Sequence, residues 1–213
     1  MTGKIRLGIL GTGKMAGDFA AGLHHANNVE LVAVGSRSLE SAQRFASAFA
    51  VPKHYATYAA LASDPQVQLV YVATPHSCHL DNSLMCLDAG KAVLCEKPFT
   101  INAREAARLI GKAREKRLFL MEAMWTRYIP AVVRLRELLA QNVIGNVQLM
   151  TAGGAYMPAF DPGNYLFRPD LGGGVLLDAG VYLVSMASMV FGAPDKVLAT
   201  ASLGRTGVDE HDA

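Results

Sequence analysis

The sequence predicts an α/β fold, in which a doubly wound parallel sheet is followed by a second, smaller α/β unit. Apolar, strand-like runs alternate with helix-like segments through the first 122 residues, and the pattern changes after Glu122. Such short apolar runs are typical of parallel strands that helices cover on both faces. Of the 213 residues, 51% are hydrophobic and 18% are charged, which suits a globular protein with a large core.

The first domain, residues 1–122, is expected to contain five clear strands. Helical spacing of apolar residues predicts helices between them, and Asn102 with Glu105 has the spacing of a capping box at the start of the last one. The expected strands are residues 5–10, 29–34, 69–73, 92–95 and 118–121, and the expected helices are residues 16–26, 38–48, 78–87 and 102–116.

The second domain, residues 123–213, has a weaker pattern. A helix is expected at 131–141 and an apolar helix from the glycines at 172–174 to about residue 190, with strand-like runs at 147–150 and 196–202. So few strands do not form a stable sheet alone. We therefore expect this domain to be incomplete, as the N-terminal part of a larger one.

Charge and cysteine content exclude some classes of function. The formal net charge is +2 with dispersed charges, which predicts neither a nucleic-acid partner nor a membrane surface. Three cysteines without Cys-x-x-Cys spacing, and no signal peptide, predict reduced thiols in the cytoplasm. The longest apolar stretch, 181–193, is expected to be too short and too polar to span a bilayer.

A glycine-rich turn is the first candidate site. GILGTGKMA places Gly11, Gly13 and Ala16 at G-x-G-x-x-A, between an expected strand and an expected helix. The first glycine allows a tight turn, the second lets the backbone approach a pyrophosphate, and the small third residue lets the helix pack closely. The motif predicts a dinucleotide site; a purely structural turn is the alternative. Further cofactor contacts are expected from Thr12, Lys14 and Met15.

The end of the second strand indicates which dinucleotide binds. An NAD site carries an acidic residue there for the ribose 2′-hydroxyl. This chain instead has Gly35, Ser36 and Arg37, and the last two can bind a 2′-phosphate through a hydroxyl donor and a bidentate guanidinium. We expect NADP as the cofactor; the alternative is that Arg37 is merely a solvated residue at a helix start.

Two turns after later strands are expected beside the same crevice. In ATPHSCHL, the spacing of His76, Cys78 and His79 is not that of a closed zinc site, so we expect no metal, and His79 is expected to cap or pack against the next helix. In LCEKPFT, Pro98 fixes the turn after Glu96 and Lys97. Lys97 could stabilise a developing alkoxide beside a nicotinamide; a surface lysine is the alternative.

In the second domain, Asp178 and Tyr182 are four residues apart, which predicts one helix face on which both point at a common ligand. A tyrosine assisted by an ammonium can transfer a proton. The alternative is a pair that hydrogen-bonds to the backbone. Near residue 125, EAMWTRYIP holds the only tryptophan, and Trp125 with Arg127 could line a substrate pocket or pack between domains.

Together these motifs resemble the glucose–fructose oxidoreductase, inositol dehydrogenase and rhizopine-catabolism (Gfo/Idh/MocA) oxidoreductase family. They are, in order, G-x-G-x-x-A, ATP-x-x-x-H, EKP, EAMWTRY and GGG-x-L-x-DAG-x-Y. EAMWTR and Tyr182 resemble the dimeric dihydrodiol dehydrogenase branch, which includes NADP-dependent D-xylose dehydrogenases. Members are longer, so the chain is expected to stop midway through the second domain.

The resemblance implies a Rossmann domain followed by part of an open, mostly antiparallel sheet domain that carries substrate and dimer contacts. It implies that Lys97 lies near the nicotinamide, that Tyr182 is the general acid/base and that Asp178 orients substrate. It also implies a cis bond before Pro98. The implied cofactor contacts are Gly11, Gly13, Arg37, Thr74, Pro75, His79 and Glu96, and the implied substrate contacts are Trp125 and Arg127.

The expected activity is NADP-dependent hydride transfer between the nicotinamide and a carbinol carbon of an aldose or a cyclic trans-diol, in a homodimer. Two alternatives remain. The chain could be an NADP(H)-binding regulator or shortened remnant without turnover, or an NAD-dependent sugar dehydrogenase in which Arg37 stacks on adenine.

Overall fold

The computed structural model describes residues 3–212, and the chain divides after Ala123 into two compact units. The first unit is built on a six-stranded sheet in which every neighbouring pair of strands is parallel. The strands are β1 (Ile5–Leu10), β2 (Val29–Gly35), β3 (Lys53–Tyr55), β4 (Leu69–Val72), β5 (Ala92–Cys95) and β6 (Leu120–Glu122).

The order of the strands is β3-β2-β1-β4-β5-β6, which confirms the doubly wound prediction. From the central β1 the chain moves outward to β3, then returns and adds β4 on the other side of β1. This reversal creates a switch point between β1 and β4, where the connecting loops diverge at the carboxyl ends of the strands. Ligands of such sheets bind in the crevice that the diverging loops leave.

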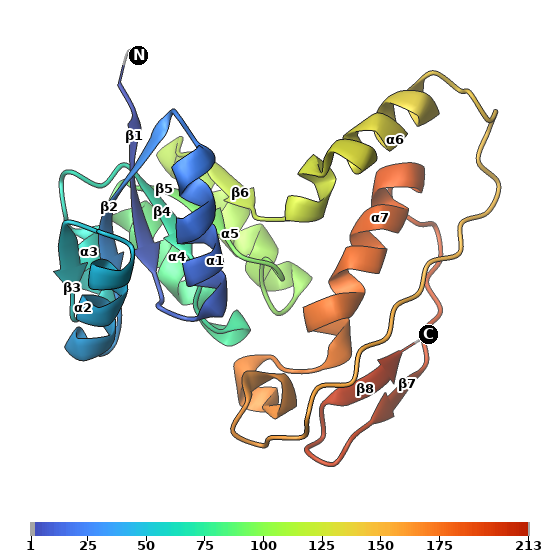
Figure 1. The fold of residues 1–213 in the computed structure, drawn as a ribbon. Helices are drawn as coiled ribbons and strands as arrows, with labels where there is room; N and C mark the ends of the chain where they lie inside the picture. The colour runs from blue at the N-terminus through green and yellow to red at the C-terminus, as the bar shows by residue number, and fades with distance from the viewer. Residues whose placement is uncertain (1–2, 213) are drawn as a thin grey trace. The chain divides into compact units, whose positions relative to one another are not determined.

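Helices cover both faces of the sheet (Figure 1). Alternation along β4 separates two apolar cores, because Val70 and Val72 pack into one core and Tyr71 into the other. The core around Tyr71 includes residues of α1 and α2, and the opposite core includes residues of α3, α4 and α5. These helices are α1 (Lys14–Gly22), α2 (Leu39–Ala48), α3 (Tyr58–Ala62), α4 (His79–Asp88) and α5 (Ala103–Lys116).

Helix starts follow the local sequence signals. The Asn102 side chain accepts a hydrogen bond from the Glu105 main-chain N–H at 3.0 Å, as the capping-box spacing predicts. The Glu105 carboxylate accepts hydrogen bonds from the N–H of Ile101 and from the side-chain amide of Asn102, both at 3.2 Å, in place of the main-chain N–H of Asn102. β3 and α3, which have three and five residues, carry too little sequence pattern to be predicted and are not among the expected elements.

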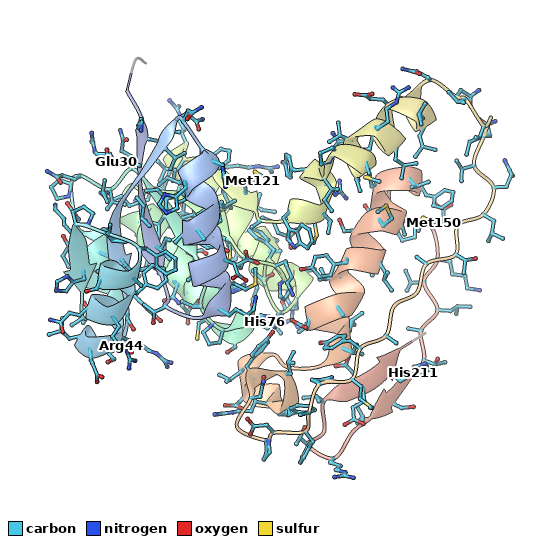
Figure 2. All side chains as sticks on the ribbon, viewed as in Figure 1. Glu30, Arg44, His76, Met121, Met150 and His211 are labelled. Atoms are coloured by element: carbon cyan, nitrogen blue, oxygen red, sulfur yellow. The ribbon has the colours of Figure 1, made fainter. Side chains whose placement is uncertain are left out.

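The second unit is irregular. Of its two predicted strands, one does not form and the other has different limits. Residues 147–150 form no strand within the described chain, and Met150 lies in an extended segment (Figure 2). Of 196–202, only the end pairs, because β7 and β8 form a two-stranded antiparallel ladder. The elements are η3 (Trp125–Tyr128), α6 (Pro130–Ala140), η4 (Tyr165–Phe167), η5 (Pro169–Leu171), the π-helical turn η6 (Leu176–Gly180), α7 (Val181–Phe191), β7 (Ala201–Leu203) and β8 (Asp209–Asp212).

One helical segment of the described residues, Pro169–Phe191, is long and apolar enough to cross a membrane by length and composition alone. The stretch 181–193, which is expected from the sequence to be too short and too polar to span a bilayer, overlaps only the C-terminal part of this segment. Because helices that pack inside soluble domains can meet the same criterion, the length of this segment does not by itself indicate a membrane span.

Candidate functional site

The register of the sheet brings the predicted cofactor residues to one edge. Leu10 is aligned with Gly35 on one side and with Val72 on the other, and the row continues through Cys95 to Glu122. The residues that follow this row therefore emerge together at the carboxyl edge of the sheet. They include Gly11, Ser36, Thr74, Glu96 and Lys97, the cofactor residues predicted from four separate motifs.

The loop after β1 has the shape of a phosphate cradle. Gly11 has φ +104°, and a Cβ added there would overlap the carbonyl oxygen of Ala73, so the close approach of β4 requires glycine. At Gly13, the N-cap of α1, an added Cβ would meet no described atom within 4 Å. The space beside Gly13 at the N-terminus of α1 is therefore open, which leaves room for a pyrophosphate at the helix start.

Other residues of this loop lie at the surface. Lys14 and Met15 are exposed and Thr12 is half-buried. The Lys14 ammonium pairs with Asp18 one helical turn further on, at 2.5 Å. Any cofactor contact of Lys14 would have to compete with that exposed ion pair.

The segment after β2 presents a cation and no carboxylate. Ser36 is buried, and its hydroxyl accepts a long hydrogen bond of 3.4 Å from the N–H of Ser38. Arg37 is exposed and lies near Tyr58: burial raises the pKa of Tyr58, and the charge of Arg37 opposes that rise. This arrangement fits a cofactor that carries a 2′-phosphate.

His79, the first residue of α4, joins two turns of the crevice. Its ring is fully buried, with Nδ1 2.7 Å from the carbonyl oxygen of Pro98 and Nε2 2.9 Å from that of Thr74. Burial lowers the pKa of His79 to about 4, so the ring is neutral at pH 7 and donates to only one of these oxygens. The expectation that His79 packs at the start of its helix is confirmed.

The EKP turn is held by side chains. The Lys97–Pro98 bond is cis, as the resemblance implies, and Lys97 is half-buried. The main-chain N–H of Lys97 donates to Glu96 Oε2 at 3.1 Å, while the other Glu96 oxygen accepts a hydrogen bond from the Tyr71 hydroxyl. Burial raises the pKa of Glu96, and these two donors and the Lys97 charge lower it in part.

In the second unit, Asp178 and Tyr182 do not belong to one regular helix. Asp178 lies in the π-helical turn η6 and Tyr182 is the second residue of α7, so the spacing of a regular α-helix does not apply between them. The hydroxyl of Tyr156 donates to Asp178 Oδ2 at 2.6 Å, and that of Tyr165 donates to Oδ1 at 3.0 Å. Burial, together with the Asp178 charge, raises the pKa of both phenols, which keeps them as donors.

Trp125 and Arg127 both contact α7. The indole Nε1 of Trp125 donates to the Tyr182 hydroxyl oxygen at 3.1 Å, because an indole N–H can only donate. The Tyr182 hydroxyl therefore does not donate its proton to Trp125. Arg127 donates to the hydroxyl of Ser185 at 3.1 Å and to its carbonyl oxygen at 2.9 Å. The guanidinium thus ties η3 to α7, a structural use that the sequence analysis did not foresee.

Three other features bear on the chemistry that the described residues can support. Between residues 3 and 212 no group of three His, Cys, Asp or Glu side chains is placed to hold a metal ion. Burial raises the pKa of Cys86 and of Cys95 to about 12, so both thiols are poor nucleophiles at pH 7.

A cavity of about 710 Å³ in the second unit is lined by Tyr156, Phe160, Phe167, Arg205 and neighbours, and no predicted site residue lines it.

Comparison with protein families agrees with this geometry. Residues 5–124 match the oxidoreductase family with an NAD-binding Rossmann fold (GFO_IDH_MocA), and residues 132–213 match the GFO/IDH/MocA C-terminal domain. The chain belongs to the Gfo/Idh/MocA oxidoreductase family. The site residues from Gly11 to Lys97 lie in the first matched range and Asp178 and Tyr182 in the second, while Trp125 and Arg127 lie between the two.

Relatives with assigned names point to one branch. Trans-1,2-dihydrobenzene-1,2-diol dehydrogenases are similar, at 42% identity over 210 residues for Mus musculus and 41% for Homo sapiens, covering 97% of this chain. The chain spans 62% of the length of those relatives. Among solved structures, KijD10, a 3-ketoreductase from Actinomadura kijaniata in complex with NADP and TDP-benzene, is 30% identical with a TM-score of 0.86, covering 98% of this chain and 65% of that one.

Several residues that shape the site carry no local sequence signal. Tyr156 and Tyr165 reach Asp178 from 22 and 13 residues away in the chain, and Tyr71 reaches Glu96 from 25 residues away. Glu122, at the end of β6, accepts a hydrogen bond from the N–H of Phe99 at 2.9 Å. Only the fold brings these pairs together, so motif spacing could not have identified them.

Proposed function

We propose that this protein is an NADP-dependent oxidoreductase that transfers hydride between the nicotinamide and a carbinol carbon of an aldose or a cyclic trans-diol. The observation that carries the proposal is the shared carboxyl edge of the sheet, where the open N-terminus of α1, Arg37 and Lys97 emerge from neighbouring strands. The dihydrodiol dehydrogenase names of the relatives support the class of substrate.

Each residue has a proposed task. The loop at Gly11 and Gly13 holds the pyrophosphate, and Ser36 with Arg37 holds the 2′-phosphate. When bound, the nicotinamide accepts or donates the hydride. In the oxidation direction the substrate carbinol loses a hydride from carbon and a proton from oxygen. Tyr182, acting as the phenolate, takes that proton and becomes the neutral phenol, and the ammonium of Lys97 stabilises the negative charge that develops on oxygen.

Asp178 is proposed to orient the substrate. The hydroxyls of Tyr156 and Tyr165 donate to its two oxygens and so fix the plane of the carboxylate. A carboxylate that is fixed in this way discriminates between hydroxyl arrangements, which suits polyols and diols.

The catalytic proposal is tested by steady-state assays of Lys97→Ala and Tyr182→Phe with NADP and a panel of aldoses and cyclic diols. Removing a positioned charge or proton-transfer group is expected to lower kcat by about 100-fold. Exposed Lys116→Ala and Tyr128→Phe are matched controls and should keep wild-type turnover. Near-wild-type kcat in both site variants would overturn the proposal.

The cofactor proposal is tested by dissociation constants measured from nicotinamide fluorescence. Arg37→Ala is expected to weaken NADPH binding by about 10-fold to 100-fold, the loss of a charge-assisted hydrogen bond, while leaving NADH binding unchanged. Tighter binding of NADH than of NADPH by the wild type would favour the NAD alternative. Stoichiometric NADPH binding without turnover of any substrate in the panel would favour the regulator.

A further inference from the structure

Side-chain contacts hold the main chain on both sides of Lys97. The N–H of Lys97 donates to the Glu96 carboxylate, and the N–H of Phe99 donates to the Glu122 carboxylate at 2.9 Å. Between them, the carbonyl oxygen of Pro98 lies 2.7 Å from His79 Nδ1. The turn lies beyond the last paired residue of β5, Cys95, so these contacts hold the main chain from which the Lys97 side chain extends.

Tyr71 supports the contact between Glu96 and the Lys97 N–H. It is 1% exposed in the middle of β4, and its hydroxyl donates to Glu96 Oε1 while Oε2 receives the N–H of Lys97. The Tyr71 ring stacks on Phe19 of α1, with centroids 3.8 Å apart and an angle of 20° between the rings. Because sheet and helix confine the ring on both sides, the hydroxyl has one fixed position.

The Glu96 carboxylate needs both donors. It is only 7% exposed, and a buried carboxylate is stable when ionised only if hydrogen bonds replace its water. The Tyr71 hydroxyl and the Lys97 N–H supply one bond to each oxygen. A phenylalanine would fill the same space as Tyr71 and keep the stack on Phe19, but it would leave one oxygen without its donor.

We propose that Tyr71 is a positioning residue for Lys97: its hydroxyl holds the Glu96 carboxylate against the main-chain N–H of Lys97 and so fixes the turn from which the Lys97 side chain extends. The catalytic part of this inference rests on the proposed function of Lys97. The structural part, that the hydroxyl of Tyr71 fixes the turn, does not.

The charges around this contact determine how it depends on pH. Glu96 faces Tyr71 of β4 and the charge of Lys97, and Tyr71 in turn lies near Asp18 of α1 and Cys95 of β5. Burial raises the pKa of Glu96, and the Tyr71 hydrogen bond opposes that rise. Without the hydroxyl, Glu96 takes up a proton at a higher pH and then holds the Lys97 N–H less firmly.

The main test compares Tyr71→Phe with the wild type. We expect kcat at neutral pH to fall about tenfold with KM for NADP unchanged, and the acidic limb of the kcat–pH profile to move upward by about one pH unit. Adding Glu96→Gln removes the titrating carboxyl, and this double variant should lose the shift. Tyr55→Phe makes the same chemical change at a hydroxyl that donates to Asp64 at 2.9 Å, and it should leave the profile unchanged.

Amide hydrogen exchange tests the structural part without turnover. Exchange of residues 96–100 is expected to quicken about tenfold in Tyr71→Phe, while residues 5–10 of β1 stay protected. If Tyr71→Phe does not fold, Glu96→Ala removes the acceptor instead and should quicken the same amides. Unchanged exchange at 96–100, or an unchanged pH profile in an active Tyr71→Phe, overturns the inference. Wild-type turnover of Lys97→Ala would instead overturn the proposed function while the exchange result stands.

Discussion

The buried ring of His79 makes a prediction about stability that depends on pH. The perturbation is His79→Gln, which keeps a polar group at this fully buried position but cannot titrate. The folded ring has a pKa of about 4, against 6.5 for an ordinary histidine, because burial disfavours the charged form. The unfolded chain therefore binds more protons than the folded chain between these two values.

The difference between the two pKa values sets the sign and the size of the change in the free energy of unfolding with pH. A group whose pKa is lowered on folding contributes its stability above the unfolded value, and the contribution is lost as pH falls through the folded value. The gap between 6.5 and about 4 corresponds to about 3 kcal/mol. At pH 7 the substitution should destabilise the protein by about 2 kcal/mol through lost buried contacts. By pH 4 this disadvantage should vanish or reverse.

The assay is urea denaturation followed by far-UV circular dichroism at half-unit steps from pH 4 to pH 7.5. The free energies of unfolding of wild type and His79→Gln are subtracted at each pH, which cancels every other titrating group. Exposed His54→Gln is the control, and its difference from wild type should stay flat. A flat difference for His79→Gln would refute the reasoning. A difference that grows on acidification would show a charged ring that donates to both carbonyl oxygens.

Three further outcomes are expected. Gly11→Ala should weaken NADPH binding at least tenfold in a fluorescence titration, because φ +104° and the Ala73 carbonyl oxygen leave no room for a Cβ; equal affinity would contradict the cradle. Tyr156→Phe combined with Tyr165→Phe should raise the substrate KM about tenfold and change kcat less, since Asp178 loses both donors; an unchanged KM would remove Asp178 from substrate orientation. Asn102→Ala should lower the free energy of unfolding by about 1 kcal/mol in urea with no change in NADPH affinity, because only the cap of α5 is lost.

Local patterns predicted much of the first unit because its signals lie within single segments. Residues 92–95 were expected as a strand and form β5 with the same limits, and the Asn102 cap was read from its spacing to Glu105. β3 and α3 were missed because their stability comes from packing on β2 and the core, which a run of three or five residues does not reveal. The strand predicted at 147–150 does not form, because an apolar run becomes a strand only when it pairs with another strand.

The sequence by itself determined the family, the alternation of strands and helices in the first unit, the phosphate loop at Gly11 and Gly13, and the identity of Lys97 and Tyr182 as candidates. Those features depend on residue type and short spacing, which the chain carries locally. Only the tertiary structure decided which partners hold these residues: Tyr71 on Glu96, His79 between two carbonyl oxygens, and two tyrosines on Asp178. Hydrogen bonds between distant segments depend on strand register and helix packing, and no local pattern encodes them.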